Sequence, residues 1–233
     1  MNKESILNMP LGFELVDKKY YLTLASKRLK TKQGHEIFAD TIMQVQAVQE
    51  DYEKYKFKSK WINLVSSYVD FVNTPENIEG SKLQIKSYLK NDLLFYIDKP
   101  NSEFYEYQTS IYKPLINKFK DLLNIEQDLH PVSDFGEINF KLESLKLVDK
   151  YIEKLSNRDL FISLFLSRIS TSSILTVFYL TKDLTIEQFY DIAFKAEIVK
   201  LEKADDAEEA QRLKIIKQEL EILDYFFKDG LEN

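Results

Sequence analysis

Hydrophobic residues near the N-terminus alternate with polar ones, which is typical of β-strands with one buried face. Large apolar side chains recur at every second position in two runs: Phe13 and Leu15, then Leu22 and Leu24. Polar stretches at residues 17–19 and 25–27 interrupt the alternation, and each one indicates a turn. We therefore predict two or three short strands between residues 13 and 38, with a later turn at Gly34.

Beyond residue 40 the apolar residues are spaced three or four apart, which is the period of an α-helix. Asp40 or Thr41 could cap the first such segment, because a carboxylate or hydroxyl there can accept a hydrogen bond from the free amides of a first helical turn. The helical segments share this spacing and lie at residues 41–55, 61–71, 75–88, 142–155, 160–180 and 207–227. We predict an α+β fold, with a small N-terminal β-rich domain at residues 1–72 and a larger all-helical domain at residues 73–233.

A short apolar run at residues 93–97 stands between Asp92 and a break at residues 98–100. Such a run between breakers favours a strand that is buried on both faces. The next segment, residues 104–118, again has helical spacing, but it contains Pro114. Because proline disturbs the interior of a helix, we predict two short helices or one helix kinked at that point.

The apolar segment at residues 160–180 has no polar side, and a helix of that kind is buried. Small hydroxyl residues at 170–173 occupy its middle, and we expect them to let a neighbouring helix approach closely. The pattern from Thr185 to Gln188 is a capping box. The helix after it should direct Glu197 and Glu202 outward.

The composition excludes several classes of chemistry. Hydrophobic residues make up 44% of the 233 residues and aromatic residues 13%, as in globular proteins. The chain has no cysteine, which rules out disulfides, thiol catalysis and thiolate metal sites. Its two histidines cannot build a multi-histidine metal site. The net charge of −6 does not favour nucleic acid as a partner.

The first residues carry neither the apolar core of a signal peptide nor the arginine-rich character of a transit peptide. No apolar stretch approaches the roughly 20 residues needed to cross a bilayer. We therefore expect a soluble intracellular protein without membrane insertion, in the bacterial cytoplasm, or in the mitochondrial matrix if the source is eukaryotic.

Two charged clusters are candidates for chemistry. The lysine-rich residues 54–60, with aromatic residues between them, could bind phosphate, but a solvated connector is the simpler interpretation. The acidic residues 205–209 could in principle hold a divalent metal for hydrolysis, although solvated helix surface explains them as well. No nucleophile motif and no glycine-rich phosphate loop accompany either cluster. We therefore expect neither an enzyme nor a bound cofactor or metal.

The segment around residues 92–114 resembles the signature of one family. That signature has Asp-Leu-Leu-x-Tyr, then a proline, a glutamine and a second proline. The residues that carry this resemblance are Asp92, Leu93, Leu94, Tyr96, Pro100, Gln108 and Pro114. The chain is similar here to the assembly chaperones of the F-type ATP synthase head, which guard its alpha subunit. The family's cysteine, arginine, tryptophan and aspartate are replaced by Phe95, Ile97, Tyr112 and Lys113.

The resemblance continues into the acidic helix near the C-terminus. This chain keeps Glu197, Glu202, Glu209 and Ala210 of that helix's motif, whereas Ala196, Lys200, Ala204 and Ala207 depart from it. The resemblance implies a monomeric chaperone that holds the unassembled alpha subunit until the beta subunit replaces it. Alternatives are a general holdase or an acidic-residue metal-dependent hydrolase. The resemblance implies partner-binding roles for Glu197, Glu202, Glu209, Asp92 and Gln108, and salt bridges between domains are an equal explanation for the three glutamates.

Overall fold

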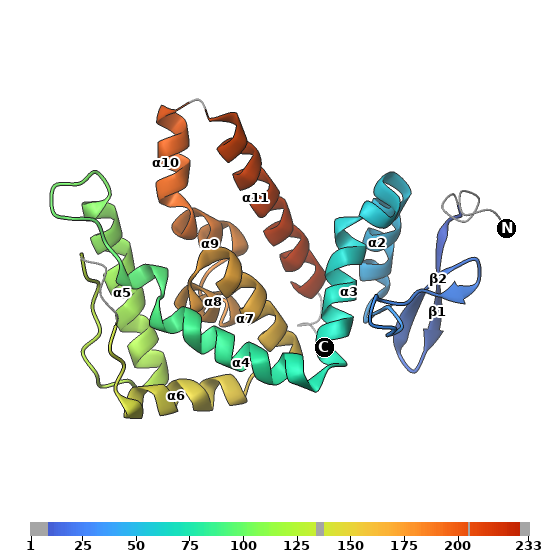
Figure 1. Ribbon diagram of the computed structural model, residues 1–233, viewed down its shortest axis with the longest axis horizontal. Helices are drawn as coiled ribbons and strands as arrows, with labels where there is room; N and C mark the ends of the chain where they lie inside the picture. Colours follow the sequence, from blue (N-terminus) through green and yellow to red (C-terminus); the bar gives the residue numbers. More distant parts are fainter. Residues whose placement is uncertain (1–8, 134–137, 205, 229–233) are drawn as a thin grey trace. The chain divides into compact units, whose positions relative to one another are not determined.

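The computed structural model describes residues 9–133, 138–204 and 206–228 (Figure 1). The contacts divide the chain into two compact units. The first unit comprises Met1–Asn77 and Gln218–Asn233, and the second comprises Ile78–Lys217. A small antiparallel sheet followed by helices confirms the α+β fold. The boundary after residue 72 stays a prediction.

The sheet of the first unit contains four strands, β1 (Leu11–Val16), β2 (Lys19–Leu24), β3 (Lys27–Arg28) and β4 (Phe38–Ala39). Strand β2 lies in the centre. It pairs with β1 along one side and with both β3 and β4 along the other, always antiparallel.

The two predicted hairpin turns are present although neither contains glycine. Asp17 and Lys18 both have positive φ, of 49° and 64°, and so do Ala25 and Ser26, of 52° and 61°. These angles are those of the turns whose twist matches a hairpin. Gly34 forms the later turn, with φ of 93°, and a hydrogen bond from the Thr31 amide to the His35 carbonyl closes it.

Helices α2 (Ile42–Tyr55) and α3 (Lys60–Val72) complete the first unit together with the end of α11 (Ala207–Lys228). A short 3₁₀ helix, η1 (Lys56–Lys58), joins α2 to α3. Of the two predicted caps, Thr41 caps α2, and it does so in a capping box with Gln44. The Gln44 side chain also donates to the Phe226 carbonyl at 2.5 Å, which fixes the end of α11 against α2. The apolar residues buried in this core include Leu22, Val45, Val48, Tyr52, Val65, Val69, Leu223 and Phe226.

The second unit is helical. In order, its helices are α4 (Pro75–Lys90), the 3₁₀ helix η2 (Leu93–Phe95), α5 (Tyr105–Leu123), α6 (Leu142–Glu153), α7 (Asn157–Ser170), α8 (Ser173–Leu180), α9 (Ile186–Ala193), α10 (Lys195–Lys203) and the first half of α11. Its fully buried residues include Leu94, Phe95, Ile116, Phe119, Leu166, Ile174, Phe178 and Phe189. Helix α5 continues past Pro114 as one assigned helix.

The predicted buried strand at residues 93–97 is wrong. Asp92 caps the 3₁₀ helix η2 by accepting a hydrogen bond from the Leu94 amide at 3.1 Å. Leu94 and Phe95 are nevertheless fully buried. Ladder pairing is limited to a single bridge between Tyr96 and Val132. The apolar run therefore correctly indicates burial but not the type of secondary structure, because a short apolar run fits a buried strand and a buried helical segment equally well.

The single helix predicted over residues 160–180 is also wrong, because the hydroxyl residues in its middle end one helix and begin another. Thr171 adopts a left-handed conformation after α7, and the Ser172 hydroxyl accepts from the Leu175 amide to cap α8. The helix after Thr185 is likewise divided at Phe194 into α9 and α10. Among the described residues, no helix is long and apolar enough to cross a membrane.

Candidate partner-binding surface

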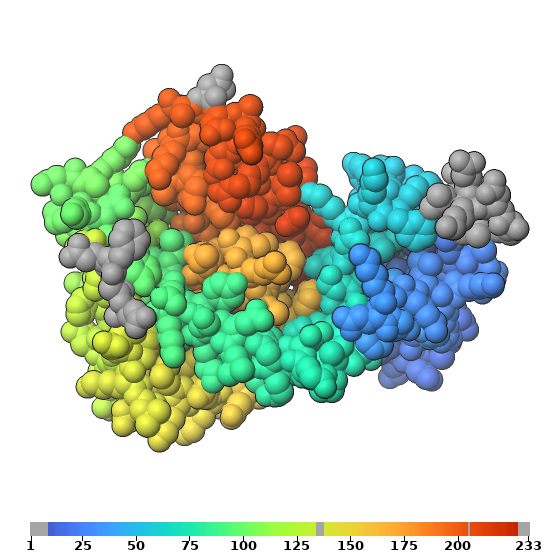
Figure 2. All heavy atoms as spheres, in the orientation of Figure 1, coloured from blue at the N-terminus to red at the C-terminus, as the bar shows by residue number. Residues whose placement is uncertain are grey.

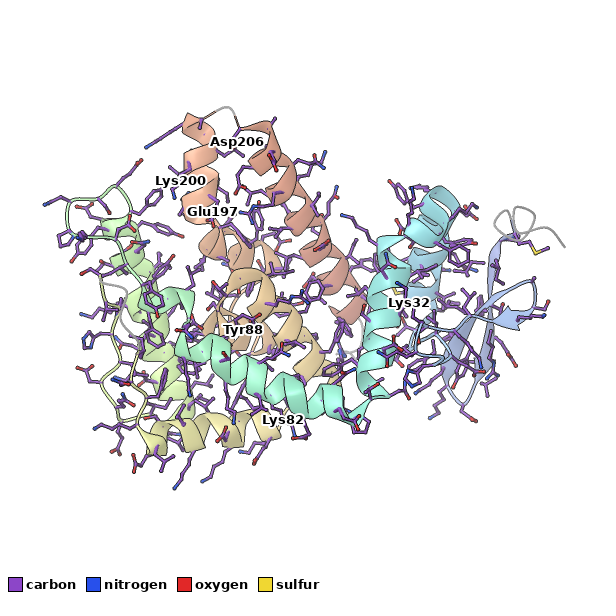
Figure 3. The ribbon with its side chains drawn as sticks, in the orientation of Figure 1. Lys32, Lys82, Tyr88, Glu197, Lys200 and Asp206 are labelled. Atoms are coloured by element: carbon purple, nitrogen blue, oxygen red, sulfur yellow. The ribbon has the colours of Figure 1, made fainter. Side chains whose placement is uncertain are left out.

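The five residues with predicted partner-binding roles fall into two environments, both within the helical unit. Asp92 and Gln108 lie inside it, with 0% and 9% of their surface exposed. The three glutamates lie on α10 and on the first turn of α11. Figure 3 marks this region by Glu197 and Lys200 on α10 and by Asp206 at the turn into α11.

Asp92 joins the start of η2 to the start of α8. One carboxylate oxygen accepts from the Ser172 hydroxyl at 2.7 Å and from the Leu94 amide, and the other accepts from the Ile174 amide at 2.9 Å. Complete burial raises the pKa of Asp92 to about 7, although these hydrogen bonds act in the opposite direction by favouring the charged form. The carboxylate thus satisfies donors that would otherwise be buried without partners.

Further hydroxyl groups surround this carboxylate. The Ser173 hydroxyl donates to the Ile85 carbonyl of α4 at 2.8 Å, and it lies 3.2 Å from the Ser167 hydroxyl of α7. Ser167 also lies 3.3 Å from the Thr176 hydroxyl. This hydroxyl cluster connects α4, α7 and α8, and each of its polar groups has a partner. The predicted serine stretch therefore acts through hydrogen bonds in addition to its small size.

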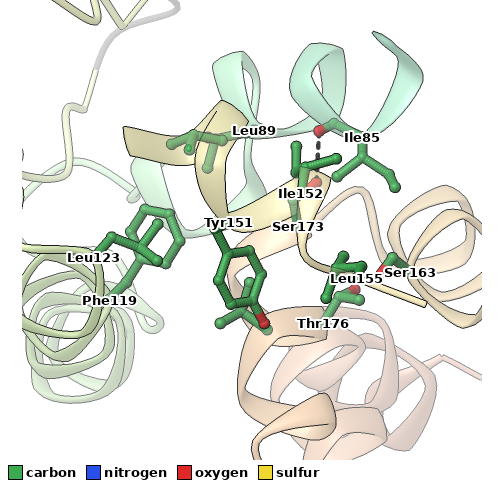
Figure 4. A pocket seen from close by; sticks show the side chains of 12 residues that line it. Ile85, Leu89, Phe119, Leu123, Tyr151, Ile152, Leu155, Ser163, Ser173 and Thr176 are labelled. Carbon is green, nitrogen blue, oxygen red and sulfur yellow. Dashed lines mark hydrogen bonds between the residues drawn. The ribbon is translucent and has the colours of Figure 1, made fainter. Parts of the chain in front are cut away.

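A small apolar cavity adjoins the hydroxyl cluster (Figure 4). Its volume is about 20 Å³, which is room for about one water molecule. Apolar side chains dominate its lining, among them Leu89, Phe119, Leu123, Ile152 and Leu155, with Ser173 and Thr176 at one end. The cavity is a packing defect of the helical core and is too small for an organic ligand.

Gln108 stabilises the start of α5. Its side-chain oxygen accepts a hydrogen bond from the Asp98 amide at 2.7 Å, and the Asp98 carboxylate in turn accepts from the Ser102 hydroxyl at 3.0 Å. These contacts fold the segment between η2 and α5 against the helix. As with Asp92, the residue that matches the family signature organises backbone inside the unit.

We call Glu197, Glu202 and Glu209 the acidic surface. Glu197 is partly exposed, and its charge acts on the phenols of Tyr112 and Tyr190 and on the Arg212 guanidinium. Its carboxylate therefore lies where α5, α9, α10 and α11 converge. Among the described residues, no hydrogen bond or ion pair engages Glu197 or Glu202.

Glu209 differs from the other two glutamates because it has a partner. Arg212, one turn later on α11, donates from Nε and Nη2 to its two carboxylate oxygens at 2.7 and 2.6 Å. This pairing lowers the pKa of Glu209 and raises that of Arg212. Asp206 caps α11 by accepting from the amides of Glu208 and Glu209. Figure 2 shows α10 and the start of α11 as one continuous orange-red surface of the helical unit.

One residue that the sequence singled out only as a departure from the family signature connects the two environments. Tyr112 is buried, and desolvation is the main cause of the raised pKa of its phenol. The charges of Glu197, Asp98 and Asp92 raise this pKa further. The sequence signal for it is an aromatic residue two positions before Pro114. No cluster of acidic or histidine side chains suited to a metal ion occurs in the described ranges.

Solved structures of other proteins share the fold of this molecule. The crystal structure of Atp12 from Paracoccus denitrificans superposes with a TM-score of 0.75 at 15% identity, over 93% of this chain and 94% of the other. A mutant of P. denitrificans Atp12p gives 0.76 at 15% identity, over 94% of both chains. The Atu1473 protein of Agrobacterium tumefaciens, a putative chaperone, gives 0.74 at 16% identity, over 93% of this chain and 84% of the other.

A family model also matches part of this sequence. Residues 9–120 match the family model described as "ATP12 chaperone protein". This match, over slightly less than half of the chain, confirms the resemblance to this chaperone family found at residues 92–114. The comparison with curated protein sequences gives no match.

Proposed function

We propose that this protein is an assembly chaperone that binds the unassembled alpha subunit of the F-type ATP synthase head. The match of residues 9–120 to the ATP12 chaperone family model carries the proposal. A subunit without its neighbours exposes surface that is buried in the finished complex, and such surface is prone to aggregation. The chaperone shields that surface by binding, without making or breaking covalent bonds.

The acidic surface contributes to client binding in this proposal. Glu197 and Glu202 have no ion-pair partner among the described residues, so their charges are available to a basic client surface. Glu209 is already paired with Arg212 and contributes less. Asp92 and Gln108 act indirectly in this proposal, because they organise the interior of the helical unit that carries the acidic surface.

Release follows from competition. A partner that binds the client more tightly displaces the chaperone by mass action, and the beta subunit is that partner in this proposal. The chaperone works as a monomer, in the bacterial cytoplasm or the mitochondrial matrix. Light scattering after size exclusion would show the monomer and its complex with one client.

The direct test is capture of purified alpha subunit as it is diluted from denaturant. The chaperone should keep it soluble in a stoichiometric complex, and added beta subunit should release it. The double variant Glu197→Lys with Glu202→Lys should capture alpha subunit at least about tenfold more weakly, because charge reversal repels a basic client. Its thermal unfolding should change little, since both positions are on the surface.

A matched control is the double variant Glu126→Lys with Glu153→Lys, which makes the same charge change at two exposed positions outside the acidic surface. Equal loss of capture in this control would show that net charge alone matters. Equal protection of an unrelated aggregating protein would indicate a general holdase instead. Turnover of a substrate that requires added Mg²⁺ or Mn²⁺ would favour a hydrolase and contradict the proposal.

A further inference from the structure

Strand β1 is a free edge of the sheet. The order of strands places β2 between β1 on one side and β3 with β4 on the other. Within the ranges that the structure describes, no strand pairs with the outer side of β1. Residues Leu11–Val16 therefore offer a six-residue edge in extended conformation.

The register identifies which backbone groups of β1 point outward. Leu22, in the centre of β2, donates its amide to the Ile37 carbonyl at 2.9 Å and accepts from the Leu29 amide at 2.8 Å, so both groups point away from β1. Its partner on β1 is Phe13, so Phe13 and Leu22 form a non-hydrogen-bonded pair. By alternation, the N–H and C=O groups of Phe13 and Leu15 face the free edge.

Leu11 faces the same way, and its carbonyl already accepts a hydrogen bond from the Gln49 side chain of α2 at 2.6 Å. One end of the edge is thus closed by α2, while the groups of Phe13 and Leu15 remain without partners among the described residues. This leaves two donors and two acceptors that match an added strand.

The side chains at the same two positions are apolar and exposed. Phe13 is 44% exposed and Leu15 is 57% exposed. Both lie on the face that carries buried Leu11 and Leu22, so they extend the core face of the hairpin to its edge. Phe13 also makes an edge-to-face contact with Tyr20 at 5.7 Å between ring centroids.

Natural sheets usually protect such an edge with a proline, a lysine, a bulge or a charge that points inward. Strand β1 has none of these, since its one charged residue, Glu14, lies on the opposite face. There Glu14 shares Arg28 with Glu36, so two carboxylates compete for one guanidinium. An unprotected edge with an acidic residue between two apolar ones has the form of a binding site for an extended peptide.

We propose that β1 binds an extended segment of the client as an added strand, and that this segment carries a basic residue between two apolar ones. The apolar side chains pack beside Phe13 and Leu15, and the basic one lies opposite Glu14. The identity of the client rests on the proposed function, whereas the chemistry of the segment rests on β1 alone.

A second copy of this chain fits the edge less well. The symmetric antiparallel register that pairs Phe13 of one copy with Leu15 of the other uses all four free groups of each. That register also places Glu14 directly opposite its own copy, and like charges at that position are destabilising. A foreign strand with a basic residue avoids this repulsion.

The test uses a labelled seven-residue peptide in which valine and lysine alternate, with two matched peptides. One replaces lysine by glutamate, and the other carries N-methyl groups on its valines, which removes backbone donors. Fluorescence anisotropy should show binding of the lysine peptide only. Amide exchange at Phe13 and Leu15, followed by NMR, should slow when it binds.

Three variants sharpen the test. Leu15→Pro removes an outward donor without breaking a bond to β2, and it should weaken binding about tenfold or more. Leu15→Ser keeps the backbone donor and should weaken peptide binding less. It still tests the inference if the proline variant fails to fold. Glu14→Lys should reverse the preference toward the glutamate peptide.

The matched control is Leu83→Ser, which removes a leucine that is 66% exposed on α4 in the other unit and should leave peptide binding unchanged. Equal binding of all three peptides, or a β1-dependent dimer in light scattering, would overturn the inference. Capture of alpha subunit separates the two proposals. If Leu15→Pro captures it normally while the double variant of the acidic surface does not, the proposed function stands and the β1 site fails.

Discussion

Asp92 and Glu197 both match the same family pattern in the sequence, yet the structure gives them opposite environments. Asp92 is fully buried and accepts hydrogen bonds from a hydroxyl and two amides. Glu197 stands partly exposed without a bonded partner among the described residues. A shared motif therefore does not imply a shared role, because burial decides whether a carboxylate organises the fold or faces a partner.

The largest expected effect is loss of the Asp92 carboxylate. Asp92→Ala leaves the Ser172 hydroxyl and the amides of Leu94 and Ile174 without acceptors, and we expect it to lower the free energy of unfolding by about 3 kcal/mol. Chemical denaturation would measure this. Asp92→Asn, which keeps one acceptor oxygen, should lose less. If Asp92→Ala is as stable as the wild type, the Asp92 carboxylate does not stabilise the fold, and the contrast with Glu197 is wrong.

The pH dependence of stability tests the same contrast. The pKa of folded Asp92, about 7, lies above its value of about 4 in an unfolded chain, so the folded state binds this proton more tightly. The stabilisation from this group is complete below about pH 4 and is lost as the pH rises through about 7.

The midpoint of thermal unfolding should therefore decrease as the pH rises from about 4 to about 7, and this group should cause little further decrease above that range. In Asp92→Asn, which does not titrate, this part of the fall should disappear. An identical slope in both proteins would mean that other groups account for it.

Gln108 should give an intermediate effect, because it satisfies one partly buried amide. Gln108→Ala leaves the Asp98 amide without its acceptor, at a cost of about 1 kcal/mol. Gln108→Glu keeps an acceptor in the same place and serves as the control. If both variants lose equal stability, packing and not the hydrogen bond holds the segment before α5.

Much of the fold could be predicted from the sequence, because hairpin alternation and capping residues are local signals. Thr41, one of two candidate caps, begins α2, and Thr185 caps the helix that its capping box indicates. The hairpin turns form without glycine, and their central residues nevertheless adopt positive φ angles. The pairing of the flanking strands offsets the steric cost of this conformation.

The errors fall where a distant contact decides the local structure. The run after Asp92 is not a strand because the Asp92 carboxylate binds Ser172, a residue 80 positions later in the chain. The same contact helps to interrupt the apolar segment at residues 160–180. The first event has no signal within a window of the sequence, because it depends on which helices meet. The second has a local signal in the hydroxyl of Ser172, which caps α8.

The candidate site shows the same limit. The family pattern selected five residues but could not separate the buried ones from the exposed ones. It also passed over the outward backbone groups of β1, because the register and not the residue types leaves those of Phe13 and Leu15 without strand partners in the described part of the chain.

The smallest expected effect is at Glu209, which lies between the two extremes. Its bidentate pair with Arg212 is one helical turn long and open to solvent, and exposed pairs of this kind contribute little to stability. We expect Glu209→Gln to leave the unfolding midpoint unchanged and to weaken capture of alpha subunit less than Glu197→Gln does. Added salt should leave the unfolding midpoint of Glu209→Gln equal to that of the wild type. It should weaken capture of alpha subunit by the wild type and by both variants. A clear loss of stability in Glu209→Gln would show that the pair supports the start of α11, and the acidic surface would then be divided into a structural and a binding part.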